Sequence, residues 1–223
     1  MVRISTGIAE FDEYIAAAGG APSDSADVDD IDRGAQALTV SRKTRHLERL
    51  ADLPALRRLV VRAPTDDTLK SIGEATGVEH LELCGGTMTG LSALAGLLNL
   101  RYVTISVASR MRTLDGLHHA ARLQYLSIWH CAALTSIQPL AELRRLRYLF
   151  LDGNMYKPMR LESLAPLAEL RDLEVLKLHN VRVRDEDVSA LRGLRKLTRL
   201  ELPDAIASRI GSPAPGARVL PPS

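Results

Sequence analysis

Few side chains in this sequence combine the residue types and spacing that catalysis needs. Cys84 and His80 could supply a thiol and a base, but they lie four residues apart on one predicted strand, which separates them by about 13 Å. The pair His118-His119 has no carboxylate or cysteine at the spacing of metal ligands. The segment Gly73–Gly77 lacks the lysine and the preceding strand of a phosphate-binding loop. We therefore expect no catalytic residue, no metal site, no cofactor and no enzymatic activity.

The cysteines and the hydropathy pattern indicate where the protein acts. Cys84 and Cys131 have a spacing that suits neither a disulfide framework nor a zinc site, so we interpret them as free thiols. The N-terminus lacks the apolar segment of a secretory signal. The longest apolar run, Leu91–Leu100, is interrupted by Ser92, Gly96 and Asn99 and is shorter than the roughly 18 residues of a membrane span. We expect a cytoplasmic protein with no membrane contact.

The elements that would position any site are set by aliphatic residues. Hydrophobic residues make up 46% of the 223 positions, aromatic residues make up only 4%, and 37 positions are leucine. Pairs of apolar residues two positions apart recur every 22 to 27 residues, at Leu59/Val61, Leu81/Leu83, Val103/Ile105, Leu126/Ile128, Leu149/Leu151, Leu176/Leu178 and Leu200/Leu202. Positions 3, 6, 9 and 12 before each pair are also Ala, Val, Ile or Leu in every unit. Such units cannot bury their apolar faces alone, so they must stack into a curved solenoid with a parallel sheet on its inner face.

This pattern resembles the leucine-rich repeat family. The stretches Ser136–Leu146 and Ser163–Leu176 are similar to the short internalin-like repeat, and the resemblance covers about residues 37 to 204. It implies an α/β leucine-rich-repeat solenoid of about seven or eight repeats, with short helices or turns on the convex face, and it suggests a bacterial protein. Many unrelated proteins use this scaffold for binding, so the resemblance does not identify a function.

The resemblance is incomplete at the turn after each strand. The asparagine that usually closes the repeat is present only as Asn154, and Cys131 stands in its place in the preceding repeat. Other units have Pro, Gly, Ala or Val there, so their turn geometry is left open. Acidic residues before Leu69 and before Val188 each predict an N-capped helix in the second half of their units.

We expect three segments: an N-terminal capping helix and acidic linker (1–36), the leucine-rich-repeat domain (37–210), and a disordered Pro-rich tail (211–223). In the predicted helix over residues 7–18, Ile8, Phe11 and Ile15 share one face, with Tyr14 beside them. Residues 1–34 carry net charge −6, whereas the rest of the chain carries +8. Whether the acidic segment masks arginines of the inner face is left open.

Candidate binding residues lie on the inner face, where the side chains that flank each apolar pair point away from the core. Five of the eight aromatic residues occupy such positions in three adjacent repeats: Tyr102, Tyr125, Trp129, Tyr148 and Phe150. The three tyrosines would form an exposed ladder about 10 Å long. Charged neighbours would form its rim, and an insertion after Asn154 would extend it: His80, Glu82, Asp152, Lys177, His179 and Tyr156.

These residues predict a monomeric protein–protein interaction module that binds a protein partner through the inner sheet face. Its role could be that of an immunity protein against a toxin, a regulator of an enzyme, or an effector delivered into a host. One alternative is a nucleic-acid-binding protein that uses Arg58, Arg62 and Arg199 with the aromatic ladder as a stacking platform. A second alternative is that the aromatic residues only pack against neighbouring strands.

Overall fold

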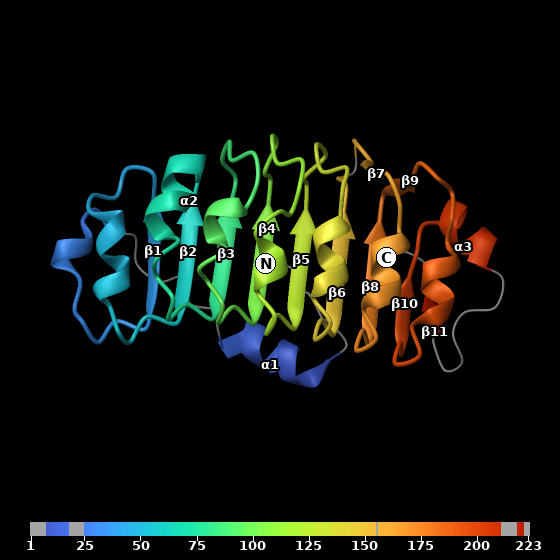
Figure 1. Cartoon of the computed structure of the whole chain (residues 1–223), viewed down its shortest axis with the longest axis horizontal. Helices are drawn as coiled ribbons and strands as arrows, with labels where there is room; N and C mark the ends of the chain where they lie inside the picture. Colours follow the sequence, from blue (N-terminus) through green and yellow to red (C-terminus); the bar gives the residue numbers. More distant parts are fainter. Residues whose placement is uncertain (1–7, 18–24, 155, 211–217, 221–223) are drawn as a thin grey trace.

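The computed structural model describes residues 8–17, 25–154, 156–210 and 218–220. Nine parallel strands form one sheet in the order β1-β2-β3-β4-β5-β6-β8-β10-β11 (Figure 1). Each of the first eight strands in this order belongs to one repeat, which confirms the expected solenoid of about eight units. None of the described helices is long and apolar enough to cross a membrane.

The strands are short and regularly spaced. Those of the large sheet are β1 (Ala37–Ser41), β2 (Arg58–Arg62), β3 (His80–Cys84), β4 (Tyr102–Ser106), β5 (Tyr125–Trp129), β6 (Tyr148–Asp152), β8 (Val175–His179), β10 (Arg199–Glu201) and β11 (Arg218–Leu220). Two further strands, β7 (Met159–Leu161) and β9 (Val181–Val183), form a small parallel sheet of their own. The insertion after Asn154 leads into β7, so it adds a strand pair beside the main sheet.

The convex side consists mainly of 3₁₀ helices. They are η1 (Val28–Asp30), η2 (Leu47–Asp52), η3 (Ser92–Leu94), η4 (Leu117–His119), η5 (Gln138–Glu142), η6 (Ala165–Glu169) and η7 (Ser189–Gly193). Apolar residues spaced by three face one direction in a 3₁₀ helix because it has three residues per turn. The spacing by threes in each repeat therefore favours this geometry over an α-helix.

Two predicted capped helices have different outcomes. The α-helix α2 (Asp66–Ile72) begins as expected, and its N-cap Thr65 accepts a hydrogen bond from the Thr68 amide. The second prediction is wrong in helix type, because the acidic run before Val188 leads into the 3₁₀ helix η7. Its N-cap residue is Val188, which makes no side-chain cap, and Asp187 just before it accepts a hydrogen bond from the Ser189 amide at 2.8 Å.

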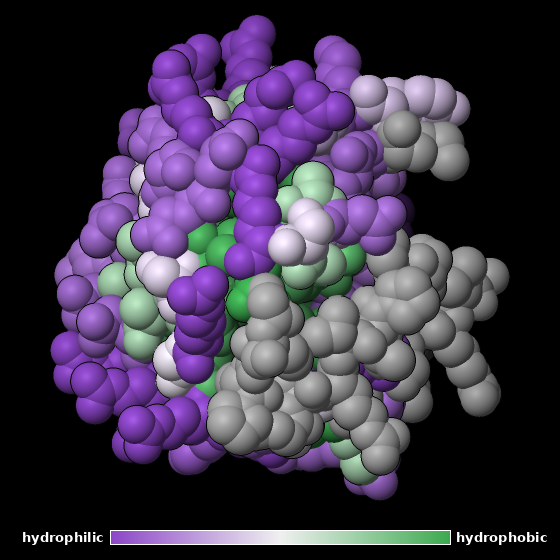
Figure 2. All heavy atoms as spheres, turned by 90° about the vertical axis from the view of Figure 1, so that its right-hand side faces the viewer, coloured by the Kyte–Doolittle hydropathy of each residue, from purple (hydrophilic) through white to green (hydrophobic). Residues whose placement is uncertain are grey.

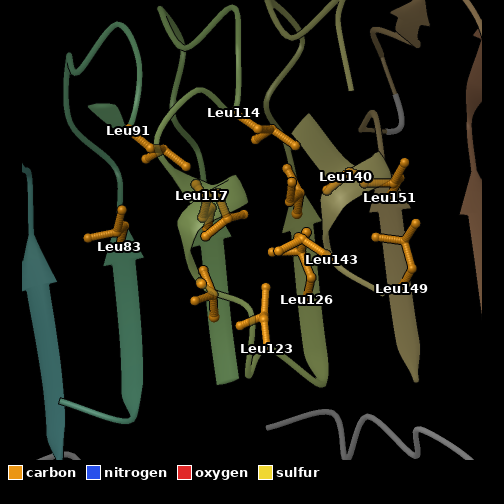
Figure 3. Packing of buried hydrophobic residues seen from close by; sticks show 14 of the residues in the cluster. Leu83, Leu91, Leu114, Leu117, Leu123, Leu126, Leu140, Leu143, Leu149 and Leu151 are labelled. Atoms are coloured by element: carbon orange, nitrogen blue, oxygen red, sulfur yellow. The ribbon is translucent and has the colours of Figure 1, made fainter. Parts of the chain in front are cut away.

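The core lies between the sheet and the convex segments. Leucines from both layers point toward one another in successive repeats (Figure 3). Leu126 on β5 and Leu149 on β6 are register partners, and both are fully buried. Each repeat therefore buries its apolar side chains against those of its neighbours, as expected for a solenoid.

Backbone hydrogen bonds close the turns after five strands, both in units that lack the asparagine and in the unit that has Asn154. Just after each of β2 to β6, one backbone amide donates to a carbonyl of the next repeat; the donors are Ala63, Gly85, Val107, His130 and Gly153. The non-glycine residues Ala63, Val107 and His130 adopt φ values of 50 to 58° there. A backbone ladder thus satisfies one amide in each of these turns.

The ends of the solenoid differ from the expected arrangement. The predicted helix exists as α1 (Ala9–Ala17), but its place at an end of the solenoid is wrong, because it packs against strands in the middle of the sheet (Figure 1). The first repeat is instead covered by part of the predicted linker. The Ser25 amide donates to the Thr39 carbonyl, and Val28 is buried in the core.

The C-terminal end is closed by α3 (Asp204–Ile210), which buries Ile206 and Ile210. Viewed from this end, hydrophilic residues surround a centre in which hydrophobic residues are visible (Figure 2). The prediction of a disordered tail is wrong for Arg218–Leu220, which form β11 and pair with β10. The rest of the predicted tail lies outside the described residues.

Candidate partner-binding face

Three tyrosines begin three neighbouring strands. Tyr102, Tyr125 and Tyr148 are register partners on β4, β5 and β6, as the repeat spacing predicts. The rings of Tyr125 and Tyr148 are stacked, with centroids 4.5 Å apart and an interplanar angle of 4°. We call these three residues the tyrosine column.

The tyrosine column is covered by α1, so the expectation that it is exposed is wrong. The Phe11 ring packs edge-to-face against all three tyrosines, with centroid distances of 5.7, 5.5 and 6.4 Å. Phe11 is 0% exposed, and each tyrosine is at most 6% exposed. The geometry is the T-shaped arrangement that aromatic rings favour. The chain thus fills much of its own predicted binding surface.

Other side chains of α1 extend this contact along the sheet. Tyr14 stacks on Tyr102 with centroids 3.8 Å apart, and its ring also lies 5.1 Å from that of His80. Ile8 is buried in the same cluster as Val175 of β8. The contact therefore reaches across five repeats, from β3 to β8. The side chain of Ile15, which was expected on this face, lies outside the described residues.

An arginine on the sheet side holds α1 electrostatically. Arg147 Nη1 lies 2.6 Å from Glu10 Oε2, and its guanidinium sits 5.2 Å from the centre of the Phe11 ring. The same arginine pairs with Glu174 through Nε at 2.7 Å. Cation–π and ionic contacts thus act together at one residue. Through Glu10, the acidic N-terminal segment therefore neutralises one arginine beside the inner face, Arg147.

Burial makes the tyrosines hard to ionise. It raises the pKa of Tyr125 to about 12 and also raises the pKa values of Tyr14, Tyr102 and Tyr148 above their ordinary range. A solvated tyrosine has a pKa of about 10. The stability that these groups give to the packed state is therefore complete below pH 10 and decreases as the pH rises from 10 through 12.

Alkaline pH should therefore release α1. In a titration followed by the ultraviolet absorbance of tyrosinate, we expect the buried tyrosines to ionise well above pH 10 in the wild-type chain. In the variant Phe11→Ala they should ionise at lower pH, because water reaches the tyrosine column. Identical titration curves for the two chains would show that α1 does not control their ionisation.

Most of the predicted charged rim is paired within the protein. His80 Nε2 lies 3.1 Å from Glu82 Oε1, and Arg58 Nη2 lies 2.7 Å from the same oxygen. Burial alone would raise the pKa of Glu82, but these two partners outweigh it and lower the pKa to about 2. Glu82 is therefore ionised and satisfied before any partner arrives.

The opposite end of the face has a second charged cluster. Glu201 is nearly buried and lies 2.6 Å from Arg199, 3.0 Å from His179 and 3.5 Å from Lys177. The nucleic-acid alternative requires three arginines. Two of them, Arg58 and Arg199, are paired with Glu82 and Glu201. The stacking platform of this alternative is also covered by α1, so the structure does not favour it.

A strip on β5, β6 and β8 stays partly open. It consists of Trp129, Phe150, Asp152 and His179, which are all partly exposed, and we call it the open strip. Trp129 and Asp152 are register partners, as are Asp152 and His179, and the rings of Phe150 and His179 meet at 5.2 Å. Burial raises the pKa of Asp152, although His179 and His130 oppose the shift. Tyr156, four residues beyond Asp152 in the chain, is 85% exposed.

Sequence reasoning missed the residues that cover the tyrosine column and those that hold its cover. These are Phe11, Tyr14, Glu10 and Arg147. A signal was available, because the only aromatic residues before the repeats stand three positions apart on one helix face, at 11 and 14. Such a face needs an apolar partner, and the aromatic positions of the sheet offered one.

Comparisons with known proteins identify similar folds. No family model and no curated protein matches the chain. An internalin (inlF) from Listeria monocytogenes is 21% identical with a TM-score of 0.51, over 82% of this chain and 59% of the internalin chain. Internalin C2 (inlC2) from the same organism is 25% identical with a TM-score of 0.57, over 78% of this chain and 74% of that one. The plant peptide hormone receptor RGFR1, in complex with RGF2, is 12% identical with a TM-score of 0.57, over 88% and 36% of the two chains.

Proposed function

This chain is a leucine-rich repeat protein, and we propose that it is a non-enzymatic binding module that holds a protein partner on the concave sheet. The fold supports this proposal because a stack of paired strands presents side chains in a fixed, extended array. The structure of the plant receptor RGFR1 in complex with RGF2 is an example of the same fold with a bound partner.

The main support for partner binding on the concave sheet is the open strip. Trp129 and Phe150 are partly exposed aromatic side chains on adjacent strands, and Asp152 and His179 stand beside them with polar groups. A few residues supply most of the binding energy of a protein interface, and large side chains such as Trp that fill a pocket of the partner are common among them. Their neighbours in the sheet fix their positions, so little conformational entropy is lost on binding.

We further propose that the protein acts in the cytoplasm as a monomer, in an immunity or regulatory role. Cys84 and Cys131 are both free thiols, which fits a reducing compartment. Delivery into a host cell as an effector is a further role open to the same binding face.

The double variant Trp129→Ala/Phe150→Ala should lose its partner without losing its fold. We expect binding to weaken by at least about 2 kcal/mol, roughly 30-fold, because two aromatic anchors are removed. The measurement is capture of proteins from a lysate of cells that express the chain, followed by titration of the captured protein against both chains. The variant Leu98→Ala is the matched control, since Leu98 is an exposed apolar residue in a convex segment.

The proposal fails if the captured partner binds the double variant and the wild-type chain equally well. Capture of nucleic acid, with an affinity that falls steeply as salt is added, would instead support the alternative function.

A further inference from the structure

The contact between α1 and the sheet is separate from the core of the solenoid. Ile8, Phe11, the tyrosine column and Val175 form one buried cluster, and among the described residues none of its members belongs to the main core. The stacked leucines would keep their packing if α1 left the sheet. The solenoid can therefore exist with this face either covered or open.

The surface under α1 is suited to water as well as to an apolar cover. The first residues of β3 to β6 are His80 and the tyrosine column, whereas the residues that follow them are aliphatic and face the core. Tyrosine and histidine combine an apolar ring with polar atoms, so they tolerate exposure better than leucine does. An uncovered leucine surface of this size would favour aggregation.

Contact with the sheet is also what keeps α1 helical. It has nine residues, and an isolated helix shorter than about 12 residues is only marginally stable in water. Docking and helix formation of this segment are therefore coupled. A competing segment that folds on the same surface would bear the same cost of helix formation, but α1 keeps the advantage of being tethered to the sheet.

We propose that the tyrosine column is a groove for an amphipathic helix, that α1 is its built-in occupant, and that a helix of a partner protein displaces α1 by presenting the same pattern. The pattern is an apolar residue, then Phe three positions later and Tyr three positions after that, as in Ile8, Phe11 and Tyr14. An acidic residue immediately before the Phe pairs with Arg147, as Glu10 does.

Each part of the pattern has a defined receptor on the sheet. The Phe enters between three tyrosine rings, the Tyr stacks on Tyr102, and the acid reaches Arg147. Helix-in-groove recognition of this kind uses side chains three and four positions apart. The groove borders the open strip through Phe150, which packs against the same cluster. The inference nevertheless stands if the open strip binds nothing, because its receptor residues are different.

A fluorescein-labelled peptide with the sequence of residues 5–20 tests this inference against the full-length chain. In the wild-type chain α1 occupies the groove at a high effective concentration, so the peptide should bind weakly. In the variant Phe11→Asp the buried charge prevents α1 from docking, and we expect the peptide to bind at least tenfold more tightly. The variant Tyr14→Asp gives the same test if Phe11→Asp does not fold.

Three controls make the result specific. The same peptide with Phe11→Asp should not bind any chain, and adding Tyr125→Asp to the Phe11→Asp chain should abolish binding. Equal affinity of the peptide for the wild-type and Phe11→Asp chains overturns the inference, as does absence of binding to a variant that circular dichroism shows to be folded. Concentration-dependent dimers of the wild-type chain in light scattering would overturn the assignment to a partner helix in favour of a second copy.

Discussion

Replacing Phe11 by alanine should release α1 from the sheet while the solenoid stays folded. Phe11 is fully buried between three tyrosine rings, and truncation of such a residue costs about 3 kcal/mol or more. That loss shifts the docking equilibrium on the order of 100-fold toward the released state. Hydrogen exchange of the α1 amides, which should become fast, measures this shift directly.

The same helix offers a control for this prediction. Glu13 is exposed on α1, so Glu13→Ala should leave the exchange of the helix nearly unchanged. The urea midpoint of the repeats should stay close to that of the wild-type chain in both variants, because the α1 cluster and the main core are separate. A large drop in that midpoint on Phe11→Ala would mean that α1 is an integral part of the folded core.

Truncating Leu126 should have the largest effect on global stability. This residue is fully buried on β5, in the middle of the stack, with Leu149 of the next repeat as its register partner. Leu126→Ala removes packing on both sides of one repeat, and we expect a loss of about 3 kcal/mol in the free energy of unfolding. Urea unfolding followed by far-ultraviolet circular dichroism measures it.

Leu98→Ala makes the same chemical change at a site that is 56% exposed. We expect it to alter the free energy of unfolding by no more than about 0.5 kcal/mol. Similar losses for the two substitutions would contradict the assignment of Leu126 to the core and of Leu98 to the surface.

The repeats were predictable because their information is local. The spacing of apolar residues by threes and then by two predicts both the buried convex segment and the strand, and it placed residues such as Tyr125 and Trp129 in register with their neighbours. The turns were less predictable, since side chains do not mark them. Backbone amides from residues as different as Ala63 and His130 make the closing hydrogen bonds.

The candidate site was only partly predictable, because periodicity is local information and does not report contacts between side chains. Periodicity identified which side chains point to the concave face, including the tyrosine column and the open strip. It could not show that His80 and Lys177 are already paired with Glu82 and Glu201, since the first contact depends on rotamers within β3 and the second on the distance between β8 and β10.

The sequence by itself determined that this chain forms a solenoid and which residues line its inner face, because each repeat contacts only its neighbours and carries its own pattern. The tertiary structure alone decided that the inner face is partly occupied. The helix around Phe11 lies about 90 or more positions before the tyrosines that it covers, and no periodicity links the two. Its place is fixed by ring packing and by the Glu10–Arg147 pair, which exist only once the repeats have stacked.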